Sequence, residues 1–270
     1  MNSASHADRF AAPDGDLVLR RDGAVATVLL NRPDSHNAIT LDMYTALPDL
    51  FGVIAADESV KVVVLRGAGV RSFASGADIS EFERVRGDAE KARVYNDRVA
   101  AAEQSIEELD KPTIAMIHGY CIGGGAGLAF AADLRFGDER TTMAITPAKL
   151  GLVYSLESTK RLVDLAGPSR AKWILMSGEK MSAAEALRVG LLDEVTPVDD
   201  LEKHTYDFAH LLTTRAQYSV RAAKTIVNRI VAGQTTEDAV TTDLRNTSFD
   251  TADYAEGVRA FLDKRTPRFG

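Results

Sequence analysis

Two turns of small residues stand where buried strands are expected to run into helices, and their backbone N–H groups are the first candidates for chemistry. Gly123 to Gly125, in "GYCIGGGAGLAFAADLR", form one turn, and "SFASGADISEF" (residues 72–82) forms the other. The first turn of a helix has unpaired N–H groups and the positive end of the helix dipole, so it favours negative charge. Two such turns can direct two N–H donors at one oxygen, an arrangement that stabilises an oxyanion.

The glycine run does not fit the common phosphate-binding fingerprints. A GxGxxG dinucleotide motif needs a third glycine at position 128, which is Leu128, and an acidic residue about 20 positions later at the end of a strand. A P-loop needs Gly-Lys-Ser/Thr, which does not follow. The simpler alternative is that the glycines only let a helix pack closely on a strand.

The elements that must position these turns alternate between β-rich and helical patterns. Residues 17–30 predict a hairpin around Asp22-Gly23. Continuous apolar runs predict buried strands, and spaced apolar residues predict helices. The expected strands are 60–67, 113–119, 141–145 and 191–195, and the expected helices are 41–57, 90–110, 216–233 and 254–265.

Strand patterns stop near residue 199, which divides the chain into three parts. Residues 1–15 predict a disordered lead-in, residues 16–198 a core, and residues 199–270 a helical C-terminal section. The expected fold class is mixed α/β.

Composition excludes several classes of protein. The chain has 270 residues and a formal net charge of −7, which argues against nucleic-acid and anionic-membrane binding. We expect no secretory signal, because residues 1–16 lack a basic segment followed by an apolar one, and no membrane span, because no apolar stretch reaches about 18 residues. The single cysteine, Cys121, excludes an intramolecular disulfide and fits a reducing cytoplasm.

Several ordered motifs resemble the enoyl-CoA hydratase/isomerase, or crotonase, superfamily over about residues 15–269. They are "LNRPDSHNAIT", "SFASGADI", "KPTIAMIHGYCIGGG", "AITPAKLGL", "MSAAEALRVGLLDEV" and "EGVRAFLDKR". The resemblance implies a crotonase-like ββα spiral core with a C-terminal oligomerisation section, assembled as a homotrimer or a dimer of trimers. It also implies an acyl-CoA thioester substrate, with coenzyme A as part of the substrate and no metal or separate cofactor.

The resemblance assigns roles to the two turns. Ala77 and Gly124 are expected to donate their backbone N–H groups to the thioester oxygen, which becomes an enolate. Arg32 is expected near the CoA phosphates. The residues expected along the adenine are Ala74, Ser75 and Gly76, and those expected at the pantetheine or a phosphate, often of a neighbouring subunit, are Phe261 and Lys264.

Hydratases of this superfamily use two glutamates, and the resemblance places them at positions 127 and 147. These positions are Gly127 and Pro147 here. Neither residue can transfer a proton, and losing such a group typically costs a factor of about 10²–10⁴ each. The ordinary hydratase mechanism is therefore not expected.

Decarboxylation of a malonyl-type thioester needs no base to start, so an acyl-CoA lyase of this kind is the favoured hypothesis. "AITPAKLGLVYSL" is similar to the methylmalonyl-CoA decarboxylase branch, which makes Thr146 and Tyr154 candidates for orienting the substrate. A phenol can hold a carboxylate out of the thioester plane. That branch carries histidine where this chain has Ala77 and an acidic residue where it has Gly127.

Two alternatives remain open. An enoyl-CoA hydratase or double-bond isomerase could use a relocated base, for which Glu157 is the candidate. The protein could also bind CoA thioesters without catalysis. The sequence does not identify the acyl chain.

Overall fold

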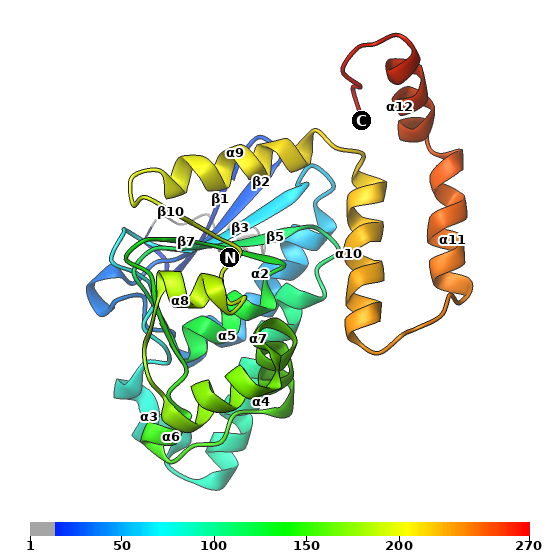
Figure 1. Cartoon of the computed structure of the whole chain (residues 1–270). Helices are drawn as coiled ribbons and strands as arrows, with labels where there is room; N and C mark the ends of the chain where they lie inside the picture. Colours follow the sequence, from blue (N-terminus) through cyan, green and yellow to red (C-terminus); the bar gives the residue numbers. More distant parts are fainter. Residues whose placement is uncertain (1–13) are drawn as a thin grey trace, which may run out of the picture.

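The computed structural model describes residues 14–270, which form two β-sheets surrounded by helices (Figure 1). The large sheet has the strand order β1-β2-β3-β5-β7-β10, and the small sheet has the order β4-β6-β8-β9. The strands are β1 (Leu17–Asp22), β2 (Val25–Leu30), β3 (Val62–Gly67), β4 (Ser72–Ala74), β5 (Thr113–Ile117), β6 (Tyr120–Ile122), β7 (Leu134–Asp138), β8 (Thr142–Ala144), β9 (Met181–Ser182) and β10 (Glu194–Thr196).

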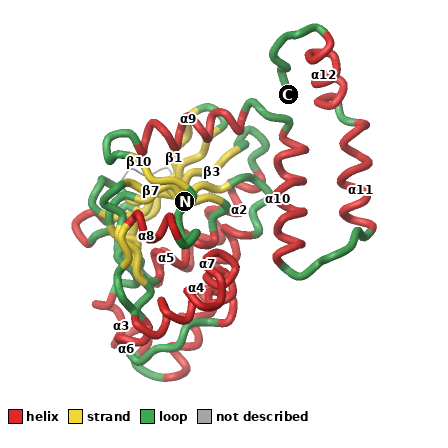
Figure 2. Tube along the Cα trace, in the orientation of Figure 1, coloured by secondary structure: helices red, strands yellow, loops and turns green. Residues whose placement is uncertain are grey.

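Helices account for most of the remaining chain (Figure 2). They are α2 (Leu41–Ala56), α3 (Phe82–Arg86), α4 (Ala89–Glu107), α5 (Gly124–Ala131), α6 (Pro147–Leu150), α7 (Leu156–Ser177), α8 (Ala183–Arg188), α9 (Leu201–Thr213), α10 (Gln217–Val231), α11 (Ala239–Thr247) and α12 (Ala252–Leu262). Three short 3₁₀ turns join them: η1 (Pro33–Ser35), η2 (Ile79–Glu81) and η3 (Ser248–Asp250). The expected mixed α/β class is confirmed.

The large sheet begins with the predicted hairpin and continues with parallel strands. β1 and β2 pair antiparallel around Gly23, whose φ of +54° suits glycine. β2, β3, β5, β7 and β10 are parallel neighbours. Every residue of β2 is buried, because helices cover both faces of this part of the sheet.

The small sheet brings the two small-residue turns together. β4 and β6 are parallel neighbours, although they lie almost 50 positions apart in the sequence. The carboxyl ends of neighbouring parallel strands meet at one edge of a sheet. The segments that follow them, Ser75–Asp78 and Gly123–Gly124, therefore lie side by side.

The C-terminal section is helical, as predicted, and has two parts. α9 packs its buried Leu201 and Ala209 against the large sheet. α10 lies beside the body, where its Lys224 pairs with Asp133, and α11 and α12 extend further out (Figure 1). All three helices leave large apolar side chains exposed. The exposed set in these three helices is Val227, Ile230, Val231, Val240, Tyr254, Val258, Phe261 and Leu262.

Two further expectations concern the N-terminal lead-in and membrane-spanning helices. Most of the predicted lead-in, residues 1–13, lies outside the described residues. In the described part of the chain, no helix combines the length and apolar character needed to cross a bilayer.

Candidate active site

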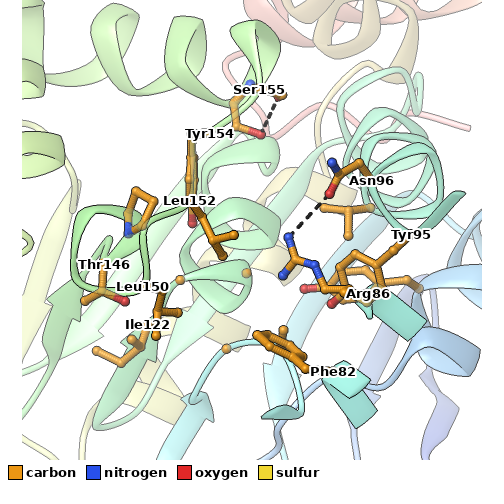
Figure 3. Close-up of a pocket in the computed structure, with 18 of the residues that line it drawn as sticks. Phe82, Arg86, Tyr95, Asn96, Ile122, Thr146, Leu150, Leu152, Tyr154 and Ser155 are labelled. Carbon is orange, nitrogen blue, oxygen red and sulfur yellow. Dashed lines mark hydrogen bonds between the residues drawn. The ribbon is translucent and has the colours of Figure 1, made fainter. Parts of the chain in front are cut away.

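A cavity of about 250 Å³ opens where the two small-residue turns meet (Figure 3). Its wall comes from both turns, from α2, α3 and α4, and from the segment 146–158 that contains α6 and the start of α7. Ala77, Gly124, Thr146 and Tyr154, the four predicted catalytic residues other than Glu157, all line this cavity.

The N–H group of Ala77 is directed away from the neighbouring strand-like segment. Ile39 forms an isolated parallel bridge with Ala77, in which Ile39 N donates to Gly76 O and Asp78 N donates to Ile39 O. A parallel bridge of this kind uses the groups on both sides of the central residue, so the N–H of Ala77 itself faces the other way. Within residues 14–270 it has no hydrogen-bond acceptor.

Gly124 is the first residue of α5, so its N–H has no acceptor within the helix. No acceptor outside the helix is present in the described residues either. A Cβ on Gly124 would lie 3.7 Å from Ala77 N and would overlap the hydroxyl of Tyr44. Glycine is therefore required at this position by close packing, and the two free N–H groups are neighbours on the cavity wall.

Tyr154 and Thr146 lie on the side of the cavity formed by α6 and the loop that precedes α7. In Figure 3, Tyr154 and Leu152 face Arg86 and Tyr95 across the cavity. Burial, followed by the nearby Glu103 carboxylate, raises the pKa of the Tyr154 phenol. The phenol therefore stays protonated at neutral pH and can donate a hydrogen bond.

Arg86 brings a positive charge to the opposite side of the cavity. Its guanidinium lies 4.5 Å from the ring centre of Tyr95 and 4.9 Å from that of Phe82, and Nη2 is 3.5 Å from Asn96 Oδ1 (Figure 3). These cation–π contacts hold the side chain without neutralising it. No carboxylate from residues 14–270 forms an ion pair with Arg86.

Sequence reasoning missed Glu103, whose side chain lines the cavity from α4 although only 3% of the residue is exposed. Its carboxylate forms an ion pair with Arg161, which also binds Glu107. The signal was present in the sequence, because position 103 shares the buried face of α4 with Ala102 and Ile106. A glutamate on an otherwise apolar helix face is rarely buried without a partner.

Of the residues predicted to bind CoA, some line the cavity and others do not. Ser75 and Gly76 line it, whereas Ala74 is buried behind them against Gly125. Arg32 forms ion pairs with Asp78 and Asp16.

The structure does not bring the remaining predicted residues to this cavity. Glu157, in the first turn of α7, is exposed and is not part of the cavity wall. Phe261, 83% exposed, lies near the end of α12, and Lys264 follows that helix with a φ of +54°. Both lie in the part of the chain that extends away from the body (Figure 1).

Known proteins are similar to this chain over almost its whole length. The family model described as "Enoyl-CoA hydratase/isomerase" matches residues 20–270. The chain belongs to the enoyl-CoA hydratase/isomerase family. A member of the family from Hyphomonas neptunium has a similar structure, with 37% sequence identity, a TM-score of 0.92, and coverage of 97% of this chain and 99% of that chain.

Two family members named for hydration are also similar. The short-chain-enoyl-CoA hydratase of Clostridium acetobutylicum is 30% identical over 252 residues, which is 93% of this chain and 95% of that protein. The structure of enoyl-CoA hydratase from Bacillus anthracis has 28% identity and a TM-score of 0.86, and the match covers 94% and 99% of the two chains. This member of the enoyl-CoA hydratase/isomerase family is thus an acyl-CoA-processing enzyme with the crotonase fold.

Proposed function

We propose that this enzyme forms a thioester enolate from a malonyl-type acyl-CoA by releasing carbon dioxide. The observation that carries the proposal is the pair of free N–H groups on Ala77 and Gly124, which open on a cavity that also holds the Tyr154 phenol and the Arg86 guanidinium. The first pair suits an enolate oxygen, and the second pair suits the carboxylate of the substrate.

The reaction begins with cleavage of the bond between the α-carbon and the carboxylate. Carbon dioxide leaves, and the electron pair moves into the thioester to give an enolate. Two preorganised N–H donors in a water-poor site typically lower such a barrier by a few kcal/mol. No base is required for this step, so Gly127 and Pro147 do not prevent it.

The carboxylate must stand out of the thioester plane before the bond can break. Tyr154 can hold it there by a hydrogen bond, because the phenol is neutral and has no hydrogen-bond partner in residues 14–270. Thr146 lines the same cavity. The uncompensated charge of Arg86 favours an anionic acyl group over a purely apolar one.

Hydration or double-bond isomerisation is the second candidate, because one acidic side chain, Glu103, does line the cavity and two similar proteins are named hydratases. Glu157 is not a suitable base for either reaction, since its side chain is exposed outside the cavity.

The deciding experiment offers the purified protein methylmalonyl-CoA, malonyl-CoA and crotonyl-CoA in separate reactions. We expect release of carbon dioxide from a malonyl-type thioester and weak or undetectable hydration of crotonyl-CoA. Fast hydration without release of carbon dioxide would replace the proposal by the second candidate. Binding of all three without turnover would indicate a CoA-thioester-binding protein.

We further propose that the enzyme assembles as a homotrimer or a dimer of trimers through α10, α11 and α12. The exposed apolar side chains of these helices support this, since burial against neighbouring subunits would remove them from water. In such an assembly Phe261 and Lys264 would reach the CoA of a neighbouring subunit. Size-exclusion chromatography with light scattering at micromolar concentration tests the assembly, and a monomer would contradict it.

A further inference from the structure

The carboxyl group of Glu103 is the one acidic group on the cavity wall in the described chain, and decarboxylation as set out above gives it no role. It reaches the cavity from α4, which packs directly against α5. α5 carries Gly124, the oxyanion donor, and Gly127, the position at which the resemblance places a hydratase glutamate. Glu103 therefore approaches the reaction centre from a different helix than that glutamate would.

Gly127 is what admits the Glu103 carboxyl group. A Cβ on Gly127 would overlap Oε1 of Glu103 and would lie 3.2 Å from its Cδ. The carboxyl group of Glu103 therefore occupies the space through which a side chain at position 127 would enter the cavity. A glutamate at position 127 and the observed position of Glu103 exclude each other.

The two oxygens of Glu103 have different surroundings. Oε2 accepts a hydrogen bond of 2.8 Å from the Ser158 hydroxyl and another from Arg161 Nη1. Oε1 has no hydrogen bond to any residue between 14 and 270. One oxygen is thus anchored by α7, while the other is left for a group that enters the cavity.

We propose that Glu103 is the acid/base residue of this enzyme and exchanges a proton with the α-carbon of the acyl thioester. The assignment deepens the proposed function, because it rests on an enolate held by Ala77 and Gly124. It restores, from α4, a carboxyl group that the sequence lacks at position 127.

A protonated Glu103 carboxyl group can donate the proton that the enolate takes up after carbon dioxide has left. Burial raises its pKa, although Arg161 and Ser158 oppose this shift. After carbon dioxide has left, the O–H bond of the Glu103 carboxyl group breaks, a C–H bond forms at the α-carbon, and the electron pair of the enolate is consumed. The Glu103 carboxylate then recovers a proton from water.

Exchange of the α-hydrogen tests this assignment without any decarboxylation. In D₂O, the Glu103 carboxylate should remove the α-hydrogen of propionyl-CoA and return deuterium, which NMR or mass spectrometry detects. Glu103→Gln should reduce this exchange by a factor of about 10²–10⁴. Glu107→Gln is the matched control, because Glu107 also binds Arg161 but does not line the cavity.

Undiminished exchange in a folded Glu103→Gln protein would overturn the assignment, and so would the absence of exchange in the wild-type protein with bound propionyl-CoA. If the glutamine variant does not fold, the Glu103→Asp variant tests the assignment instead. It keeps the charge but withdraws the carboxyl group by one methylene, so exchange should fall at least about tenfold. Unchanged exchange in that variant would also overturn the assignment.

Release of carbon dioxide from methylmalonyl-CoA, measured on the same preparations, separates this inference from the proposed function. Exchange that depends on Glu103 without any release of carbon dioxide refutes decarboxylation and supports the Glu103 assignment. Release of carbon dioxide with exchange that is independent of Glu103 supports decarboxylation and refutes the assignment.

Discussion

Positions 127 and 147, which the family resemblance assigns to the two hydratase glutamates, differ in what stands in place of the carboxyl group. At the first, Gly127 leaves room that the buried carboxyl group of Glu103 enters from α4. At the second, Pro147 begins α6, and the nearby cavity wall carries Thr146 and Tyr154. One side of the cavity has an acid/base group, and the other has neutral hydroxyl groups.

This difference between the two positions favours a reaction that needs only one proton transfer. Activating water and protonating the α-carbon are two tasks, for which hydratases of this superfamily use two glutamates. Loss of carbon dioxide needs a single proton, delivered after the enolate has formed. The cavity has one carboxyl group, two hydrogen-bond donors for a carboxylate and two for an oxyanion. This set of groups suits the loss of carbon dioxide.

Removal of the oxyanion donor should have the largest effect, because both sides of the cavity depend on it. Gly124→Pro deletes the N–H group, and we expect turnover to fall by about 10²–10³. Gly124→Ala is the control, since its Cβ meets the same Tyr44 hydroxyl but the N–H remains. Equal losses in the two variants, measured as kcat beside affinity for CoA, would show that packing explains the effect.

A change on the Pro147 side should have the next largest effect. Tyr154→Phe keeps the ring and removes one hydroxyl, so decarboxylation should fall ten- to a hundredfold if a charge-assisted hydrogen bond of about 1.5–3 kcal/mol is lost. Binding of the product thioester, which has no carboxylate, should be unchanged by calorimetry. Normal decarboxylation by this variant would remove Tyr154 from the mechanism.

A smaller effect is expected from a methyl group on the Gly127 side. Gly127→Ala pushes Oε1 of Glu103 aside without removing the carboxyl group, so α-hydrogen exchange should fall roughly tenfold. Gly52→Ala is the matched control, because Gly52 is also helical but has open space around it. If both variants exchange at the wild-type rate, the contact between Gly127 and Glu103 has no role in proton transfer.

The smallest expected effect is on stability. Burial raises the pKa of Glu103 above its ordinary value of 4.5, so the folded protein holds this proton more tightly than the unfolded chain. The contribution is complete below pH 4.5 and is lost as the pH rises through the raised pKa. Arg161, Glu107, Tyr44 and Tyr154 face the same group and are present in both the wild-type protein and Glu103→Gln, so the comparison of the two proteins isolates the contribution of Glu103.

Urea unfolding of the wild-type protein and of Glu103→Gln at several pH values measures this contribution. We expect the free energy of unfolding of the wild type, relative to the variant, to decrease as the pH rises from 4.5. Parallel curves over the whole range would show that the Glu103 pKa is the same in the folded and unfolded states.

The two small-residue turns could be predicted from the sequence because each turn has a local signal, whereas their roles as oxyanion donors stay a prediction. Each small-residue turn directly follows a strand, and the neighbouring positions of β4 and β6 bring Ala77 and Gly124 together. The hairpin at Gly23 and the strand 62–67 were predictable for the same reason, since turn residues and apolar runs carry their own signal.

The sequence signals that Glu103 is buried, but the place of its carboxyl group at the cavity was not predictable, because that place depends on how helices pack. Glu103 meets Gly127 only through the contact between α4 and α5. Glu157, the candidate for a relocated base, directly precedes Ser158 in α7, but successive residues of a helix point about 100° apart. Ser158 and Arg161 face inward to bind Glu103, and Glu157 is exposed.

A structure with a bound acyl-CoA tests the central claim most directly, because it shows which side chain faces the α-carbon. We predict that the thioester oxygen accepts hydrogen bonds from Ala77 N and Gly124 N, and that Oε1 of Glu103 lies within about 3.5 Å of the α-carbon. A thioester oxygen bound elsewhere, or an α-carbon separated from Glu103 by other side chains, would contradict the account.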